Sequence, residues 1–394
     1  MVVKAVDSGP RRVAVFGSTG SVGRNTVDLI ARDPQRFHVV ALTANRNVAL
    51  LAEQARMLRP EIAVVADEAC YGELKARLEG SGVAVAAGRQ ALVEAAERPS
   101  DWVMAAIMGF AGLPPTLAAA RRGALVAFAN KECLVSAGAV MMEQVSRHGA
   151  TLLPVDSEHN AIFQVLDING TDAVEKLILT ASGGPFRTMD RAAMAKVTPA
   201  QAVAHPVWAM GAKISVDSAT MMNKGLEIIE AAHLFAMPED RISVLVHPQS
   251  VVHSMVEYKD GSVLAQMGTP DMQIPIAYAL AWPARMATPA PRLDLAAIGR
   301  LEFEPPDPER FPALRLAREA LRAGGNATTT LNAANEVAVA AFLEGRIGFL
   351  DIERVVAETL SRLSPRQLSG LDDVYASDEE ARAVAGAMVM PHSG

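Results

Sequence analysis

The sequence predicts an α/β protein with an N-terminal doubly wound parallel sheet, a central α+β domain and a C-terminal helical bundle. Three observations support this prediction. Short β-rich runs alternate with helical runs in the first third of the chain, strand patterns dominate the middle, and helical periodicity dominates after residue 311. Strands that alternate with helices favour a parallel sheet with right-handed crossovers. With 394 residues, the chain is long enough for two or three domains.

Composition narrows the functional class. Apolar residues make up 50% of the chain and charged residues 21%, which is typical of a globular protein. The net charge of −7 disfavours a nucleic-acid partner. The only cysteines, Cys70 and Cys133, exclude a disulfide framework and have no zinc-ligand spacing. The longest apolar stretch, 103–113, is too short for a membrane span, and residues 1–12 lack an apolar signal core. We expect a cytoplasmic protein with no membrane partner.

The N-terminal domain is predicted over residues 1–153 and the catalytic α+β domain over 154–285. A Pro-rich linker is predicted at 286–311 and the helical bundle at 312–394, because seven prolines lie between Trp282 and Pro312. The expected strands are 12–16, 38–43, 62–65, 102–107, 124–128, 177–180, 242–246, 250–258 and 262–266. The expected helices are 25–32, 48–58, 314–323, 331–344, 351–363 and one that starts at a Ser377/Glu380 capping box.

A glycine motif indicates a nucleotide site. Gly17-Ser-Thr-Gly20-Ser-Val-Gly23 follows the first predicted strand and opens the first helix. Glycines allow close approach to a pyrophosphate, and a helix N-terminus offers free N–H groups. This context predicts a Rossmann-like dinucleotide site; the alternative is a tight turn that packs the helix on the strand.

The end of the second predicted strand favours NADP over NAD. Asn45, Arg46 and Asn47 stand where an NAD site usually offers an acid to the ribose hydroxyls. Arginine suits a 2′-phosphate instead. The alternative is that Arg46 is an ordinary solvated loop residue.

Two carboxylates follow the predicted strand that starts at Leu152. Asp156 and Glu158 are two residues apart, so on an extended backbone they point the same way. A divalent cation with oxygen ligands, Mg²⁺ or Mn²⁺, would neutralise both. The alternative is a helix N-terminus carrying acidic residues.

A second polar cluster lies in the run 213–227. If the run is helical, Asn223 and Glu227 lie one turn apart with Lys224 beside them. Together with Ser218 these groups suit a phosphate, and Glu227 could be a third metal ligand. The alternative is a surface ion pair between Lys224 and Glu227.

Other segments carry weaker signals. Asn130, Lys131 and Glu132 follow a predicted strand and face either a ligand or solvent at a helix start. The segment of about 183–212 contains glycines, prolines, a histidine and a tryptophan, and is predicted to be a lid. We expect structural roles for the histidines at 233, 247 and 253, and no nucleophilic role for the cysteine at 133.

Considered together, these motifs resemble the 1-deoxy-D-xylulose 5-phosphate reductoisomerase family across nearly the whole chain. The motifs are Gly-Ser-Thr-Gly-Ser-Val-Gly (17–23), Ala-Asn-Lys-Glu (129–132), Pro-Val-Asp-Ser-Glu-His-Asn-Ala-Ile-Phe-Gln (154–164), Ser-Gly-Gly-Pro-Phe-Arg (182–187), His-Pro-Val-Trp-Ala-Met-Gly (205–211), the run 213–227, His-Pro-Gln-Ser (247–250) and Leu-Asn-Ala-Ala-Asn-Glu-Val-Ala-Val-Ala-Ala-Phe-Leu (331–343). Relatives often have Gly-Lys-Asn where this chain has 45–47; arginine keeps the positive charge.

The resemblance implies an activity and a set of site residues. The activity is conversion of the sugar phosphate 1-deoxy-D-xylulose 5-phosphate to 2-C-methyl-D-erythritol 4-phosphate, with NADPH and Mg²⁺ or Mn²⁺, by a homodimer in the non-mevalonate isoprenoid pathway. The implied metal ligands are Asp156, Glu158 and Glu227, and Lys131 and His205 complete the catalytic set. The implied substrate contacts are Lys131, Ser157, Glu158, Ser182, His205, Trp208, Ser218, Asn223, Lys224 and Glu227. The implied cofactor contacts are Thr19, Gly20, Ser21, Val22, Asn45, Arg46, Asn47, Asn130, Glu132 and Gly211.

Two other functional classes remain open. A semialdehyde dehydrogenase also begins with a glycine-rich turn, but it needs a catalytic cysteine. A non-catalytic NADPH-binding regulator would need no carboxylate cluster.

Overall fold

The computed structural model describes residues 9–167, 170–208 and 210–389, which form two compact units. Unit 1 draws on Met1–Asn130, Glu143–Asp156 and Met272–Ala290, and unit 2 on Lys131–Met142, Ser157–Asp271 and Pro291–Gly394. The start of the first predicted domain (1–8), the end of the last one (390–394) and positions 168–169 lie outside the described residues. Position 209 of the predicted lid also lies outside them. The division into three domains stays a prediction.

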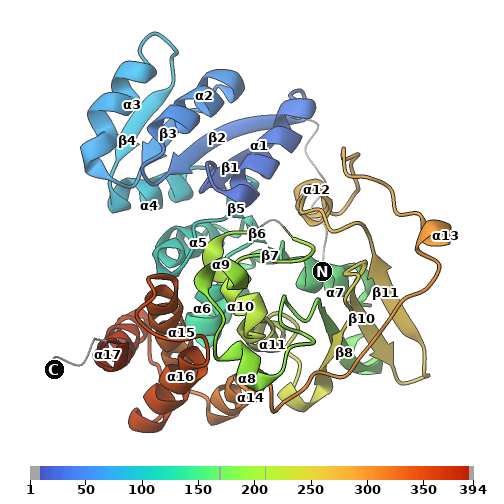
Figure 1. Cartoon of the computed structure of the whole chain (residues 1–394). Helices are drawn as coiled ribbons and strands as arrows, with labels where there is room; N and C mark the ends of the chain where they lie inside the picture. Colours follow the sequence, from blue (N-terminus) through green and yellow to red (C-terminus); the bar gives the residue numbers. More distant parts are fainter. Residues whose placement is uncertain (1–8, 168–169, 209, 390–394) are drawn as a thin grey trace. The chain divides into compact units, whose positions relative to one another are not determined.

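Unit 1 contains a sheet of seven parallel strands in the order β4-β3-β2-β1-β5-β6-β7 (Figure 1). The predicted doubly wound sheet is therefore confirmed, although the short, alanine-rich edge strand β4 was not predicted. The bounds are β1 (Arg11–Phe16), β2 (Phe37–Ala44), β3 (Ile62–Val65), β4 (Ala84–Ala87), β5 (Trp102–Ala105), β6 (Leu125–Phe128) and β7 (Thr151–Pro154).

The direction of the crossovers places helices on both faces of this sheet. From β1 to β4 the chain moves one way along the sheet, and from β5 to β7 it moves the other way, so right-handed crossovers put the two sets of helices on opposite faces. The order reverses at β1, which opens a ligand crevice outside the carboxyl ends of β1 and β5. The helices of unit 1 are α1 (Ser21–Arg32), α2 (Val48–Leu58), α3 (Tyr71–Arg77), α4 (Arg89–Glu97), α5 (Leu113–Arg121) and α12 (Gln273–Ala281). Helix α6 (Lys131–His148) belongs to unit 1 only from Glu143 on, and its first part belongs to unit 2.

Helix α12 belongs to unit 1 although it follows the second sheet in the chain. The last carbonyls of a helix have no partner within it. Side chains of the parallel sheet supply donors here: Trp102 Nε1 donates to Ala279 O at 2.9 Å, and Arg11 Nη1 donates to Leu280 O at 2.6 Å. Trp102 is completely buried, so its indole also fills the core beneath α12.

Unit 2 is built on a mixed sheet in the order β11-β10-β8-β9 (Figure 1). The predicted Asp-Gly hairpin joins β10 to β11, with Gly261 at a φ of 86°. The bounds are β8 (Val174–Ala181), β9 (Ile242–Val246), β10 (Val252–Tyr258) and β11 (Val263–Met267). Helices α7 (Ser157–Val165), α10 (Ala212–Ala219) and α11 (Met222–Leu234) carry the residues of the candidate site.

The C-terminal helices pack as predicted, with one error. They are α13 (Leu295–Ile298) within the predicted linker, then α14 (Ala313–Ala323), α15 (Ala327–Leu343), α16 (Asp351–Arg362) and α17 (Leu371–Val389). The predicted capping box is wrong, because α17 begins at Leu371 and Ser377 is buried within it. The Ser377 hydroxyl accepts a 3.3 Å hydrogen bond from Asn326 Nδ2, so it serves packing instead of capping. No helix in the described ranges is long and apolar enough to cross a membrane.

The glycine loop after β1 is held by close backbone contacts. Gly17 has a φ of 83°, and a Cβ there would lie 2.5 Å from Ala106 O. A Cβ on Gly23 would lie 2.1 Å from Gly17 O. At Gly20 the nearest such contact is 3.4 Å, which an ordinary side chain tolerates. The loop therefore needs glycine at 17 and 23 for steric reasons.

We expect Gly23→Ala to lower the free energy of unfolding of unit 1 by about 1–3 kcal/mol, because the new methyl group forces the loop off α1. Gly20→Ala is the matched control and should unfold within about 0.5 kcal/mol of the wild type, as is usual for substitutions without a clash. Urea denaturation followed by circular dichroism measures both. Equal stability of the two variants would show that no steric clash holds glycine at position 23.

Candidate functional site

The glycine loop is anchored on β2, and its outer residues remain accessible. Gly17 N donates to Thr43 Oγ1 at 3.0 Å and Ser18 N donates to Thr43 O at 2.8 Å. The Ser18 side chain is buried, where its hydroxyl donates to Gln54 Oε1. The four predicted cofactor contacts of this loop all lie in the partly or fully exposed stretch beside it: Thr19, Gly20, Ser21 and Val22. A rigid base with an open rim at a helix N-terminus fits a pyrophosphate.

The turn after β2 presents a cation next to that loop. Asn45, Arg46 and Asn47 are exposed, and Asn47 Oδ1 accepts a hydrogen bond from Leu50 N as the N-cap of α2. Arg46 Nε donates to Asp67 Oδ2 at 2.6 Å. Asp67 was not predicted from the sequence, because it follows the third strand and nothing in its local pattern links it to Arg46.

Asn130 offers a buried acceptor in the same crevice. Its Nδ2 donates to Ile107 O at 2.5 Å and to Gly109 O at 2.7 Å, which ties together the ends of β5 and β6. The residue is 2% exposed, and its Oδ1 has no hydrogen-bond partner among the described residues. A buried unpaired acceptor is unfavourable unless a ligand N–H meets it, so this atom fits a cofactor amide.

Three carboxylates converge at the turn into α7 and on α11. The ligand oxygens of Asp156, Glu158 and Glu227 lie within 4.8 Å of one another. We predicted that the first two point the same way on an extended strand. That reason is wrong, because α7 begins at Ser157 and the pair spans the turn into this helix. Three oxygen donors at this separation fit a divalent cation such as Mg²⁺ or Mn²⁺.

Two lysines compensate the carboxylates in the described structure. Glu227 is completely buried, and both Lys131 and Lys224 are nearly so. Lys224 Nζ contacts Glu227 Oε2 and lies 3.1 Å from Glu158 Oε1. Lys131 Nζ lies 3.3 Å from Glu227 Oε1 and donates to Asn223 Oδ1 at 2.9 Å. The alternative of a surface ion pair between Lys224 and Glu227 is therefore wrong, because the pair is buried.

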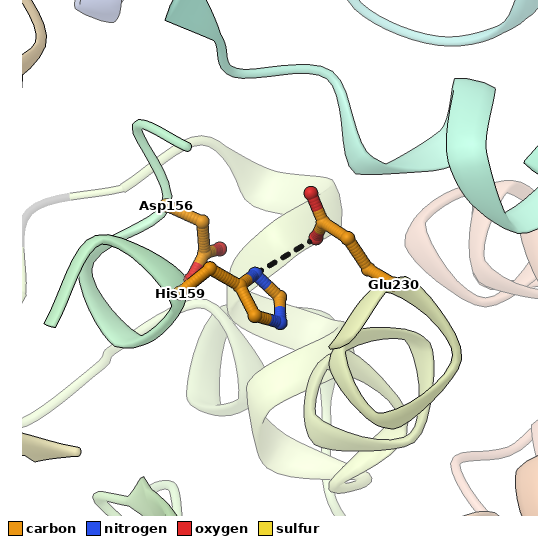
Figure 2. A group of neighbouring side chains, drawn as sticks. All are labelled: Asp156, His159 and Glu230. Atoms are coloured by element: carbon orange, nitrogen blue, oxygen red, sulfur yellow. Dashed lines mark ion pairs between the residues drawn. The ribbon is translucent and has the colours of Figure 1, made fainter. Parts of the chain in front are cut away.

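A second group of buried side chains, which was not predicted from the sequence, contacts the backbone of Glu227. His159 Nε2 donates to the backbone carbonyl of Glu227 at 2.9 Å, and His159 Nδ1 lies 3.0 Å from Glu230 Oε2 (Figure 2). His159 and Glu230 are both buried, and Asp156 lies close to them. The pair fixes α7 against α11 and so sets the position of the Glu227 backbone.

Polar groups suited to a phosphate lie on loops and helix ends of unit 2. Ser182 follows β8, Ser218 lies in α10, and Asn223 and Lys224 open α11. Gly184 has a φ of 68°, and a Cβ there would lie 2.6 Å from Ser218 O, so glycine allows the loop after β8 to approach α10. The predicted helical spacing of Asn223 and Glu227 is confirmed: Asn223 Nδ2 donates to Glu227 Oε1 at 2.5 Å.

His205 links the lid to Ser182. Its Nδ1 accepts hydrogen bonds from Val207 N at 3.2 Å and Trp208 N at 2.9 Å. Because Nδ1 is an acceptor, the neutral imidazole carries its proton on Nε2, which donates to Ser182 Oγ at 2.9 Å. Burial lowers the pKa of His205, and the nearby Glu158 charge offsets only part of that effect.

The segment predicted to be a lid is more structured than its sequence indicated. It contains α8 (Arg191–Met194) and α9 (Pro199–Ala202), whose Met194 and Ala202 side chains are completely buried. Arg310 Nη1 donates to Arg187 O at 2.7 Å, which ties down the start of the lid.

His253 lies closer to this site than its sequence context predicted. Its ring centroid lies 6.1 Å from that of Trp208, and burial lowers its pKa while the Glu158 charge raises it. The prediction that this histidine is purely structural missed its proximity to the lid. The apolar run around it gave no signal of that proximity.

Glu132 and Gly211, two predicted cofactor contacts, belong to unit 2. Glu132 accepts a 2.9 Å hydrogen bond from Lys213 Nζ, which also lies 2.9 Å from Asp217 Oδ2. Burial alone would raise the pKa of Glu132, but the Lys213 charge and hydrogen bond lower it. Gly211 is the exposed N-cap of α10.

The fully buried Cys133 cannot meet a substrate, which removes the main requirement of a semialdehyde dehydrogenase. That alternative class therefore loses its catalytic residue.

Comparison with known families covers most of the chain. The model described as "1-deoxy-D-xylulose 5-phosphate reductoisomerase" matches residues 13–138. Two further models match later parts of the chain. The model described as "1-deoxy-D-xylulose 5-phosphate reductoisomerase C-terminal domain" matches residues 152–235, and the one described as "DXP reductoisomerase C-terminal domain" matches residues 267–384.

The sequences of individual relatives align with this chain along nearly their full length. A 1-deoxy-D-xylulose 5-phosphate reductoisomerase of Rhodospirillum centenum is 69% identical over 98% of this chain and 96% of its own length. The enzyme of Zymomonas mobilis is 58% identical over 97% of this chain and 98% of its own.

Solved structures of this kind share the fold. The Zymomonas mobilis enzyme in complex with NADPH has a TM-score of 0.93 and 57% identity, covering 98% of this chain and 100% of that one. A DOX-P reductoisomerase in complex with NADPH, fosmidomycin and magnesium has a TM-score of 0.90 and 42% identity, covering 96% and 98%.

We expect the His205 imidazole to titrate below the ordinary histidine pKa of about 6.5. The folded lid then binds fewer protons than the unfolded one near that value, so its turn is fully stable above it and loses stability as the pH falls. Protonated Nδ1 can no longer accept the N–H groups of Val207 and Trp208. Titration by NMR of ¹³C-labelled histidine, with His205→Gln to assign the signal, measures the pKa. A midpoint at or above the ordinary value would show that burial does not control this imidazole.

Proposed function

The chain belongs to the 1-deoxy-D-xylulose 5-phosphate reductoisomerase family, and we propose that Asp156, Glu158 and Glu227 hold the divalent cation of its reaction. The chain catalyses the NADPH- and divalent-metal-dependent conversion of 1-deoxy-D-xylulose 5-phosphate to 2-C-methyl-D-erythritol 4-phosphate in the non-mevalonate isoprenoid pathway. One observation carries the metal assignment: the three carboxylates lie within 4.8 Å of one another. Mg²⁺ and Mn²⁺ are the cations that such all-oxygen donor sets favour.

When bound, the cation polarises the carbonyl oxygen of the substrate and NADPH supplies the hydride. The side chains of unit 2 complement this chemistry. Lys131 and Lys224 keep two positive charges beside Glu227, where negative charge would otherwise accumulate. We assign Lys131 to the reacting oxygens and Ser157 to a neighbouring substrate hydroxyl; the Ser157 hydroxyl donates to Glu158 Oε2 at 2.5 Å and so lies at the carboxylate cluster.

We assign the substrate phosphate to Ser182, Ser218, Asn223 and Lys224. These residues combine hydroxyl, amide and ammonium donors, which suit the three oxygens of a phosphate. Binding this remote group provides energy that can orient the reacting end and close the lid. His205 joins the two events, because its Nε2 donates to Ser182 while its Nδ1 holds the Trp208 backbone. Trp208 and Met210 then cover the ligands and exclude water.

We assign the NADPH contacts to three groups of residues. Thr19, Gly20, Ser21 and Val22 face the pyrophosphate, and Asn45, Arg46 and Asn47 face the ribose phosphate. Asn130, Glu132 and Gly211 face the nicotinamide end. Support for this assignment comes from the steric need for glycine in the loop, the exposed Arg46 and the unpaired Asn130 oxygen.

We expect Glu227→Gln to lower kcat at least about 100-fold, because a metal ligand contributes several kcal/mol of transition-state stabilisation. NADPH oxidation at 340 nm with 1-deoxy-D-xylulose 5-phosphate measures the rate, first with Mg²⁺ and then with EDTA. The wild type should lose its activity in EDTA. Wild-type turnover in Glu227→Gln would refute the metal assignment, and EDTA-resistant turnover would refute the requirement for metal.

Two controls separate loss of metal from loss of fold. Glu319→Gln removes an exposed carboxylate whose partner is Arg315, and it should keep full activity. Mg²⁺ should raise the thermal unfolding midpoint of the wild type and of Glu319→Gln, but not that of Glu227→Gln, since a ligand stabilises only the state that binds it.

We propose that the enzyme is a homodimer joined through the free edge of β11. This strand ends the mixed sheet, and its Val263 and Leu264 are each 48% exposed. An exposed apolar edge strand is a template for pairing with another chain. A second copy would cover this edge and extend the sheet across the interface.

We expect Leu264→Lys to shift the protein toward the monomer, because a charge on the edge opposes strand pairing. Sedimentation velocity at micromolar concentration measures the shift. Met57→Lys is the control, since Met57 is 55% exposed on unit 1 and should leave the assembly unchanged. A wild type that sediments as a monomer would exclude the dimer.

We also propose that the enzyme works in the cytoplasm. Cell fractionation with an antibody against the chain tests this location.

A further inference from the structure

A carboxylate at the end of β3 holds the cation that we assign to the ribose phosphate. Asp67 Oδ2 accepts a 2.6 Å hydrogen bond from Arg46 Nε. We propose that Asp67 is a positioning residue for cofactor selectivity: it orients the Arg46 guanidinium to bind the 2′-phosphate of NADPH. This inference rests on the proposed function only in that NADPH is the nucleotide bound.

Asp67 is itself fixed on the sheet. Its Oδ1 accepts a hydrogen bond from Ala69 N at 3.0 Å, as the N-cap of the short 3₁₀ turn Glu68–Cys70. Its backbone N donates to Asn45 O at 3.3 Å, which joins the ends of β2 and β3. Its side chain is only 23% exposed. One carboxylate oxygen is therefore anchored by the backbone, and the other is left to face Arg46.

The Arg46 guanidinium is hydrogen-bonded through its Nε and exposed at its two Nη groups. Asp67 occupies Nε, and in the described part of the chain it is the one hydrogen-bond or ion-pair partner of the Arg46 side chain. The side chain is 77% exposed, so its two Nη groups face solvent. A planar fork that is already oriented loses less side-chain freedom when it binds a phosphate.

The position of this pair matches the ribose end of a dinucleotide. β2 lies beside β1, and Ser18 N in the glycine loop donates to Thr43 O, near the end of β2. In such folds the residues just after β2 reach the adenosine ribose. NADH presents a hydroxyl there and NADPH a phosphate, so an oriented guanidinium adds a strong contact only for NADPH.

Simple electrostatics predicts the opposite sign. A carboxylate near a phosphate repels it, so removal of the Asp67 charge would tighten NADPH binding if charge were its only effect. If Asp67 acts by orienting Arg46, its removal weakens NADPH binding. The direction of the change therefore decides between the two.

The test compares Asp67→Asn with the wild type by isothermal titration calorimetry of the substrate-free protein. Asparagine remains a good N-cap for the 3₁₀ turn while it removes the charge that holds Arg46. NADPH and NADH are titrated, and then adenosine 2′,5′-bisphosphate and adenosine 5′-monophosphate as fragments. We expect a roughly five- to tenfold rise in the Kd of the 2′-phosphorylated ligands, on the order of the cost of ordering one long side chain on binding. The Kd of NADH and of adenosine 5′-monophosphate should stay within about twofold, because a hydroxyl makes no such contact.

Two further variants isolate the mechanism. Glu68→Gln removes the same charge from the next, exposed residue, and it should not weaken NADPH binding. In an Arg46→Ala background, Asp67→Asn should change no Kd further, because the residue acts through Arg46.

Three results would overturn the proposal: tighter or unchanged NADPH binding in Asp67→Asn, equal weakening of NADPH and NADH, or a full effect of Asp67→Asn without Arg46. Equal weakening would mark Asp67 as a structural cap alone. These binding results do not depend on turnover, so an inactive enzyme that still shows them would reject the proposed reaction and leave this inference in place.

Discussion

The complete burial of the Glu227 carboxylate constrains the arrangement of unit 2. A buried charge is strongly unfavourable unless it is paired, so the start of α6 must bring Lys131 to it and α11 must supply Lys224. His159 then binds the Glu227 carbonyl and fixes α7 against α11. Glu158 lies in the first turn of α7, and Lys224 Nζ lies 3.1 Å from its carboxylate, so contacts that neutralise Glu227 also join α6, α7 and α11. A cation that enters this site meets charges already organised, so binding requires little rearrangement of the helices.

The fold could be predicted from the sequence wherever the signal was local. Buried runs separated by helices of regular length indicated the parallel sheet, and the Asp-Gly turn indicated the hairpin of β10 and β11. The prediction failed where tertiary packing determines the secondary structure or the position of an element. β4 is too short and too rich in alanine to stand out, and α17 begins at Leu371, which leaves Ser377 inside the helix with Asn326 as its hydrogen-bond partner. Helix α12 packs on β-strand neighbours far from it in the chain, which no local pattern reports.

In the candidate site, too, local spacing could be predicted from the sequence and long-range contacts could not. Asn223 and Glu227 are one helical turn apart, so spacing alone placed them on one face. Asp67 is 21 residues from Arg46, and Lys213 is 81 residues from Glu132. Such pairs form only when the strand order and the helix packing are known. These pairs also contact residues that the motifs identified, so the motifs indicated candidate ligand-binding groups and gave no sign of the residues that contact them.

The lid follows a different electrostatic rule from the carboxylate cluster. Lys131 and Lys224 keep Glu227 compensated, whereas His205 works through its neutral form, which burial favours. Only the neutral ring can accept the Val207 and Trp208 N–H groups at Nδ1 while it donates to Ser182 from Nε2. A neutral histidine adds no unpaired charge to this half-buried turn. Acid converts Nδ1 from an acceptor to a donor and so breaks this turn. Protonation of His205 therefore sets an acid limit on the turn that Val207 and Trp208 form.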